Sequence, residues 1–162
     1  MIRIPIFCGP HKLGLQGFTL TELLLVLGIL SVVSLLGGSW LSKQIPYYQL
    51  NGAVRQVRAD LLAARMQAVS QGNKFRVIFA DEEHYDILDD NNNNGKADPG
   101  ETMEHRSLLK DYVGVVVHSN RNPIFHPRGT ASSLGTVTIA NQVGEKSITI
   151  SITGQVKVKS DQ

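Results

Sequence analysis

The stretch HKLGLQGFTLTELLLVLGILSVVSLLGGSWLSK, residues 11–43, is the most informative part of this sequence. It joins a short polar and basic segment to an apolar run, and residues 23–42 are 20 consecutive residues without a charge. An α-helix rises about 1.5 Å per residue, so this run matches the hydrocarbon core of a bilayer, which is about 30 Å thick. The sequence therefore predicts one membrane-spanning helix, which Lys43 closes.

The order of the polar and apolar segments is the reverse of that in an ordinary secretory signal. Such a signal is cleaved after its apolar segment, whereas here HKLGLQG precedes the apolar run and is followed by FTLTE. This arrangement resembles the class III leader of type IV prepilins. The resemblance implies cleavage between Gly17 and Phe18 by a prepilin peptidase, N-methylation of Phe18, and Glu22 as the acidic fifth residue of the mature chain. An uncleaved signal anchor is the alternative, and it explains the apolar length but not the glutamate.

The position of Glu22 has a physical consequence. An isolated carboxylate in a membrane helix costs roughly 2.5 to 3.5 kcal/mol, so Glu22 needs a partner there. The resemblance implies that Glu22 of one subunit pairs with the new α-amine of Phe18 on a neighbour, and that the partners are other pilins or pseudopilins in a filament. A carboxylate in the first helical turn also interacts favourably with the helix dipole.

Composition excludes several classes of protein. The apolar fraction of 42% and the charged fraction of 19% fit neither wholesale disorder nor a polytopic membrane protein. Removing Arg3 and Lys12 with the leader leaves 14 of the 16 basic residues against 14 acidic ones, so bulk attraction to nucleic acid is not implied. The only cysteine, Cys8, also lies in the leader. The histidines show no metal-ligand spacing and no serine stands in a nucleophile elbow, so we expect no enzyme.

Residues 43–72 have the pattern of an amphipathic helix that ends at Gly72. Its apolar residues recur at three- and four-residue steps: Leu50, Val54, Val57, Leu61, Ala64 and Ala68. Pro46 is expected to limit or kink the preceding membrane helix where this pattern begins. The remaining charged residues are interpreted as a solvated face: Arg55, Arg58, Asp60 and Arg65.

Beyond Asn73 the apolar period falls to two, which predicts strands at 75–79, 84–88, 112–118, 136–140, 147–153 and 155–159. The expected fold class is α+β. A long N-terminal membrane-spanning and amphipathic helix packs on a C-terminal antiparallel β-sheet or β-sandwich head. The expected segments are a leader (1–17), a transmembrane helix (18–42), an amphipathic helix continuing into the head (43–72) and a β-rich globular head (73–162).

The segment from Pro123 to Val158 resembles the end of the GspH/FimT group of minor pilins and pseudopilins. Phe125, Pro127 and Gly129 fit the pattern F-x-P-x-G, and Gly135 and Gly154 fit its later glycines. The resemblance implies a single-pass protein of the bacterial inner membrane, with its head in the periplasm or at a filament tip. It also implies a role in assembling or initiating a type II secretion pseudopilus or a type IV pilus.

An asparagine-rich loop satisfies the spacing of a calcium loop, D-x-[DN]-x-[DN]-G-x5-E, with Gly95 at the sharp turn. The predicted ligands are oxygens of Asp90, Asn92, Asn94, Asp98 and Glu101, with the Lys96 carbonyl. Residues 81–104 hold nine acidic residues against Lys96 alone, a repulsion that Ca²⁺ would relieve. The flanks read as strands, so the loop would bridge a hairpin and is not an EF-hand. A solvated turn is the alternative.

DNA is not favoured as a partner. Some FimT-like pilins bind DNA through G-R-x-R, but here the corresponding residues are Gly154-Gln155-Val156-Lys157. Lys157 and Lys159 are interpreted as solvated charges, although Arg121, Arg128 and Lys146 would enlarge a basic patch if they lay nearby. A FimT-like head that binds DNA or a secreted substrate stays open as the alternative function.

We predict that the native protein begins at Phe18, because the apolar span places the junction after Gly17 at the cytoplasmic face of the membrane. Mass spectrometry of the N-terminal peptide measures this. A chain beginning at Met1, or one cut after Ser42, would contradict the prepilin interpretation.

Overall fold

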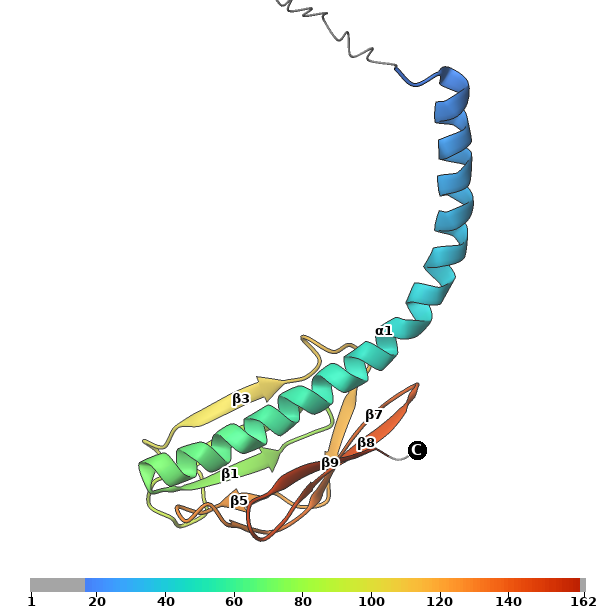
Figure 1. The fold of residues 1–162 in the computed structure, drawn as a ribbon. Helices are drawn as coiled ribbons and strands as arrows, with labels where there is room; N and C mark the ends of the chain where they lie inside the picture. The colour runs from blue at the N-terminus through green and yellow to red at the C-terminus, as the bar shows by residue number, and fades with distance from the viewer. Residues whose placement is uncertain (1–16, 161–162) are drawn as a thin grey trace, which may run out of the picture. The chain divides into compact units, whose positions relative to one another are not determined.

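The computed structural model of the chain describes residues 17–160, except for the side chains of 36–41 and 160. Within that range, one helix, α1 (Leu20–Gln71), precedes nine strands (Figure 1). The strands are β1 (Lys74–Phe79), β2 (His84–Asp90), β3 (Met103–Ser107), β4 (Val116–Ser119), β5 (Ile124–Phe125), β6 (Ala131–Ser132), β7 (Thr136–Asn141), β8 (Gly144–Ile150) and β9 (Val156–Ser160). The chain divides into two units, residues 1–40 and 41–162, and the second unit is the head.

The head part of α1 buries the apolar stripe that the sequence predicts. Leu50, Val54, Val57, Leu61, Ala64 and Ala68 are all at most 5% exposed. The helix ends at Gln71, and Gly72 closes it with φ of +77° and a hydrogen bond of 3.2 Å from its N–H to the Ala68 carbonyl. The predicted buried face and the predicted helix end are both confirmed. A helix face that packs against sheets needs apolar residues at this three- and four-residue spacing.

Pro46 lies inside α1 and does not end the helix. The side chains of the β7–β8 hairpin hold this turn of the helix. Asn141 Nδ2 donates to the Pro46 carbonyl at 2.7 Å, and Lys146 Nζ donates to the Asn51 side chain. Tertiary contacts thus outweigh the local preference of proline for ending a helix.

Two antiparallel sheets complete the head, with strand orders β3-β2-β1-β5-β6 and β4-β7-β8-β9 (Figure 1). The register pairs Phe75 with Phe125 and Ile139 with Lys146. Side chains of α1 and of both sheets form one core, whose largest fully buried members are Tyr85, Phe125, Leu61, Leu88 and Leu108. The predicted α+β architecture, a helix packed on antiparallel sheets, is confirmed.

The predicted strand at 112–118 is wrong over its first half, since β4 begins at Val116. Tyr112 lies in a turn instead, with its N–H donating to the Leu108 carbonyl at 2.8 Å. Its ring rests on Gly52 of α1, where a Cβ would lie 2.4 Å from Tyr112 Cε1. The glycine leaves room for the aromatic ring, and that long-range contact replaces strand pairing.

The predicted strand at 147–153 also differs, because β8 ends at Ile150. A turn follows in which the Gly154 N–H donates to the Ser151 carbonyl at 2.8 Å, with φ of +74° at Gly154. At the other end of β8, Asn141 and Gly144 pair with each other around a two-residue connection.

No helix within the described residues combines the length and the apolar character needed to cross a membrane. The predicted span of 23–42 is therefore not confirmed. Six of its residues, 36–41, have side chains outside the description. The predicted leader, apart from Gly17, also lies outside the described residues.

We predict that Tyr85→Phe destabilises the head by about 1 to 3 kcal/mol, because a hydrogen bond to a charged group is lost. Tyr85 is fully buried, and its hydroxyl donates to the Asp60 carboxylate. Burial, and to a smaller extent this hydrogen bond, raises the pKa of Tyr85 far above its usual range, so the phenol stays protonated. Thermal unfolding followed by circular dichroism measures the effect. The exposed Tyr48 supplies the control Tyr48→Phe, and equal melting temperatures for the two variants would contradict the prediction.

Candidate functional site

The N-terminal motif forms a capped first turn of α1. Thr19 precedes the helix, and its hydroxyl accepts a hydrogen bond of 3.3 Å from the Glu22 N–H. Glu22 is thus the third residue of the helix, as in a capping box. Phe18 is 81% exposed and Glu22 is also exposed. In the part of the chain with described side chains, Glu22 forms no ion pair, so its carboxylate is available to another molecule.

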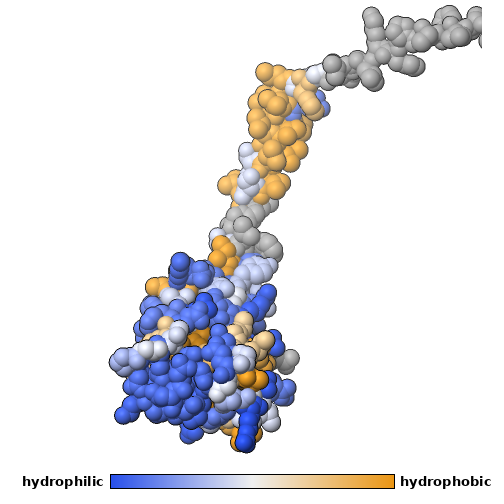
Figure 2. Space-filling view, turned by 90° about the vertical axis from the view of Figure 1, so that its left-hand side faces the viewer, coloured by the Kyte–Doolittle hydropathy of each residue, from blue (hydrophilic) through white to orange (hydrophobic). Residues whose placement is uncertain are grey.

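Apolar side chains cover the first part of α1 on all sides. From Leu20 to Leu35 the exposed large apolar residues are Leu20, Leu23, Leu24, Leu25, Val26, Leu27, Ile29, Leu30, Val32, Val33 and Leu35, each at least 44% exposed. Figure 2 shows them as an almost continuous apolar surface. A helix that is apolar all round is stable only when other molecules cover it. These side chains are therefore expected to be covered by apolar groups of other molecules.

Arg65 joins the helix to the two C-terminal loops of the head. Its Nε donates to the Gly129 carbonyl at 2.8 Å, and its Nη2 donates to the Thr153 carbonyl at 3.3 Å. We call these two hydrogen bonds the Arg65 clamp. A Cβ at Gly154 would lie 2.1 Å from the Gly129 oxygen and 2.6 Å from Arg65 Nε. Glycine at 154 is therefore required for the clamp to close.

The interpretation of the helix charges as one solvated face is wrong for Arg65 and for Asp60. Asp60 accepts the hydrogen bond of the Tyr85 hydroxyl and lies 4.0 Å from Arg106 Nε. Arg55 and Arg58 are exposed, as expected. The spacing of charges along the helix carried no signal for these contacts, because the partners lie on distant strands and loops.

The family pattern in the C-terminal segment consists of core and turn positions. Phe125 is fully buried, and Gly129 has φ of +77° in a turn that its own N–H closes onto the His126 carbonyl at 2.8 Å. Gly135 faces the 120–121 turn, where a Cβ would lie 2.6 Å from Asn120 Oδ1. These residues shape the head and present no reactive group.

The asparagine-rich loop brings most of its predicted ligands together. Asp90 Oδ2 accepts a hydrogen bond of 2.8 Å from the Gly95 N–H. Asn92 Nδ2 donates to Asp98 Oδ2 at 2.8 Å, and Asn94 Nδ2 donates to the same oxygen. These amides, Asn92 first, hold the pKa of Asp98 below its usual value.

Glu101 closes the loop by accepting hydrogen bonds from two backbone N–H groups, those of Asp98 at 3.0 Å and Asn92 at 3.5 Å. The Lys96 N–H donates to Asn94 Oδ1 at 2.7 Å, and the Lys96 carbonyl forms no hydrogen bond within the described chain. Among residues 17–160, no group of three or more His, Cys, Asp or Glu side chains is arranged to hold a metal ion. Half of the predicted ligands here are amide or backbone oxygens, and calcium binding stays a prediction.

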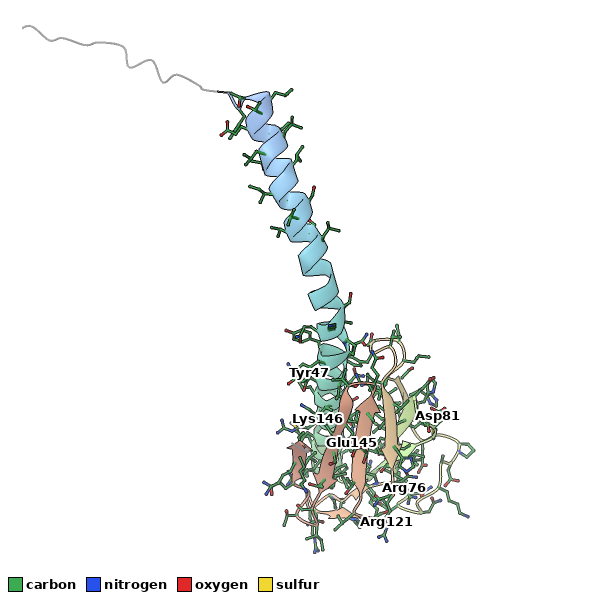
Figure 3. The ribbon with its side chains drawn as sticks, turned by 90° about the vertical axis from the view of Figure 1, so that its right-hand side faces the viewer. Tyr47, Arg76, Asp81, Arg121, Glu145 and Lys146 are labelled. Atoms are coloured by element: carbon green, nitrogen blue, oxygen red, sulfur yellow. The ribbon has the colours of Figure 1, made fainter. Side chains whose placement is uncertain are left out.

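The basic residues that the sequence singles out come from β8, β9 and two loops of the head. Lys157 and Lys159 are exposed on β9 and pair with Thr149 and Ser147 of β8. Arg121 and Arg128 are exposed in loops. Lys146 lies 5.9 Å from the centre of the Tyr47 ring, and Figure 3 shows it apart from Arg121, which is toward the other end of the head. The structure brings no observation in favour of a DNA-binding patch.

The chain resembles known proteins in sequence and in fold. It matches the family described as Type II transport protein GspH over residues 53–155. The type IV minor pilin FimU of Pseudomonas aeruginosa has a similar fold, with a TM-score of 0.57 and 16% identity over 70% of this chain and 90% of FimU. The minor pseudopilin EpsH of the Vibrio cholerae type 2 secretion system is also similar, with a TM-score of 0.54 and 14% identity over 69% of this chain and 97% of EpsH. At these identities the likeness shows the fold. No curated protein matches the sequence.

We predict that Arg65→Met destabilises the head by about 1 to 3 kcal/mol, because it leaves two carbonyls without their donor. The control is Arg58→Met, an exposed arginine on the same helix whose loss is expected to cost less than about 0.5 kcal/mol. Gly154→Ala is expected to be at least as damaging as Arg65→Met, because its Cβ would overlap the Gly129 oxygen at a positive φ. Thermal melts compare the three variants. Matching melts for the two arginine variants would show that the clamp adds nothing to stability.

Proposed function

The chain belongs to the GspH family of minor pseudopilins and pilins, and we propose that it inserts in the bacterial inner membrane and helps assemble or initiate a filament. That filament is a type II secretion pseudopilus or a type IV pilus. The role is structural: the head lies in the periplasm or at the filament tip, and the apolar helix holds the subunit in place.

The observation that carries this proposal is the all-round apolar surface between Leu20 and Leu35, which is interrupted near its start by the carboxylate of Glu22. Before assembly, lipid covers these side chains and the helix serves as a single-pass anchor. After assembly, helices of neighbouring subunits cover them. The same surface suits both environments, because lipid tails and the apolar side chains of neighbouring helices can both cover it.

Glu22 supplies the specificity of the helix packing. A carboxylate that leaves water with the helix needs a counter-charge. We propose that a prepilin peptidase releases an α-amine at Phe18, which is then N-methylated, and that this amine pairs with Glu22 of the adjacent subunit. Phe18 and Glu22 are both exposed and lie on either side of the Thr19 cap. A pairing of this kind fixes the axial offset between neighbours.

We predict that Glu22→Gln leaves membrane insertion intact but lowers incorporation into filaments at least about tenfold, because the neighbour's amine loses its partner. Co-purification with the major subunit measures incorporation, and the membrane fraction measures insertion. The control is Ser31→Ala, since the Ser31 hydroxyl only bonds the Leu27 carbonyl of its own helix at 2.8 Å. Undiminished incorporation of Glu22→Gln, with Ser31→Ala also normal, would remove the pairing role.

A further inference from the structure

Asp90 is the one charged side chain among the described residues that is buried, at 1% exposure. Its carboxylate points into the loop that follows β2, where Oδ2 accepts the Gly95 N–H at 2.8 Å. Its other oxygen, Oδ1, is buried with no hydrogen-bond partner in the described chain. An unsatisfied buried carboxylate oxygen is costly, so a ligand that engages Oδ1 would stabilise the head.

We propose that the loop from Asp90 to Glu101 binds Ca²⁺, with Asp90 Oδ1 as an anchoring ligand. The proposal concerns the head alone and does not depend on the filament role of the helix. Calcium prefers six to eight oxygen ligands from carboxylates, amide oxygens and backbone carbonyls. The loop offers this kind of set: three carboxylates, two asparagine side chains and the Lys96 carbonyl.

The remaining donors lie around the same turn. Asp98 contacts both asparagine amides, and Glu101 contacts the backbone of Asn92 and of Asp98. Gly95, the sixth residue of the loop, has φ of +78°, which supplies the sharp turn that a twelve-residue calcium loop needs. The carboxylates of positions one, nine and twelve thus belong to one hydrogen-bonded loop.

The asparagine amides occupy the place that a cation would take. Asn92 Nδ2 and Asn94 Nδ2 both donate to Asp98 Oδ2, so their positive ends face the carboxylate. Rotation of each terminal amide exchanges nitrogen for oxygen, and it gives up the hydrogen bonds that Asn92 Oδ1 and Asn94 Oδ1 accept from the Asn94 and Lys96 N–H groups, at 2.9 and 2.7 Å. Oxygens of Asn92, Asn94 and Asp98 would then converge on one ion, and the hydrogen bonds to Asp98 would give way to ion contacts.

Three basic side chains lie near the loop, and none neutralises Asp90. Lys74 Nζ donates to the Asn93 carbonyl at 3.2 Å, and Lys96 is exposed. Arg76 on β1 (Figure 3) reaches over Gly95, with Nη2 2.5 Å from where a Cβ would lie, yet forms no ion pair with any described carboxylate. These charges weaken cation binding, so we expect an affinity typical of extracellular modules, about 0.1 to 1 mM.

An ion in this loop would tie together the two strands that it connects. Asp90 is the last residue of β2, and Glu101 stands just before β3. β3 pairs only with β2 within its sheet, and the Asp89 N–H donates to the Thr102 carbonyl at 2.9 Å. Ligands at both ends of the loop would hold this edge strand in register. Calcium is therefore expected to slow hydrogen exchange of the β3 amides.

The test uses the full chain in detergent, freed of metal with a chelator and then titrated with Ca²⁺ or Mg²⁺ alone. Calorimetry measures binding, and circular dichroism follows thermal unfolding. At ten times its dissociation constant, Ca²⁺ should favour the folded state about elevenfold, which raises the melting temperature by about 3 to 8 °C. Mg²⁺ should do less, because it demands octahedral geometry and dehydrates reluctantly.

Glu101→Gln and Asp98→Asn each remove one ligand charge without changing side-chain size, and each should weaken Ca²⁺ binding at least about tenfold. Asp90 is left unchanged because it is buried. The control is Glu82→Gln, an exposed glutamate in the β1–β2 turn, which should bind Ca²⁺ like the wild type. Melts in chelator show which variants fold. If Glu101→Gln does not fold, the Ca²⁺ affinity of Asp98→Asn tests the proposal.

Two results would overturn the proposal. One is the absence of saturable Ca²⁺ binding by the wild type up to 10 mM, about ten times the weakest affinity expected. The other is binding that both loop variants retain at wild-type strength, which would place the ion elsewhere. Slower hydrogen exchange at residues 103–107 in Ca²⁺, lost in the loop variants, would support the proposal independently.

Discussion

The burial of one face of α1 is the constraint on which the head depends. Leu50, Val57 and Leu61 are buried in the core that the helix shares with both sheets, and each contributes on the order of 1.5 to 3 kcal/mol by leaving water. Ala64 and Ala68 are fully buried at the end of the same face. Their small side chains let the sheets approach the helix closely, so the helix and both sheets share one core.

Polar contacts then fix how the helix sits on the sheets. Asp60 binds the buried Tyr85 hydroxyl of β2, and Arg65 binds the Gly129 and Thr153 carbonyls of two C-terminal loops. Apolar burial is non-directional, whereas these hydrogen bonds require one rotation and one axial position of the helix. The glycine at 154 belongs to the same constraint, because any side chain there would displace the Gly129 carbonyl or the guanidinium.

The two units of the chain are suited to different surroundings. The first carries apolar side chains that the described chain leaves exposed, together with the carboxylate of Glu22. The second has an apolar core of its own, to which the helix and both sheets contribute. The proposed role in a filament calls for both properties, since the helix would pack with lipid or neighbours while the head would stay folded in water.

Properties that depend on local pattern could be predicted from the sequence. The helix face from Leu50 to Ala68, the stop at Gly72 and most of the strands follow from periodicity and from residues with restricted backbone conformation. The α+β class follows from the order of these elements. The calcium-loop spacing of residues 90–101 could also be recognised in the sequence, because all the predicted ligands lie within twelve residues of chain.

Which helix charges are solvated and which are bound follows from tertiary contacts, and it could not be predicted from the sequence. Arg65 meets carbonyls 64 and 88 residues away, and Tyr112 leaves its predicted strand to rest on Gly52. The burial of Asp90 with one oxygen unpartnered likewise depends on how the end of β2 packs in the head. Contacts between distant segments arise from the shape of the folded chain, and local spacing along a sequence does not encode that shape.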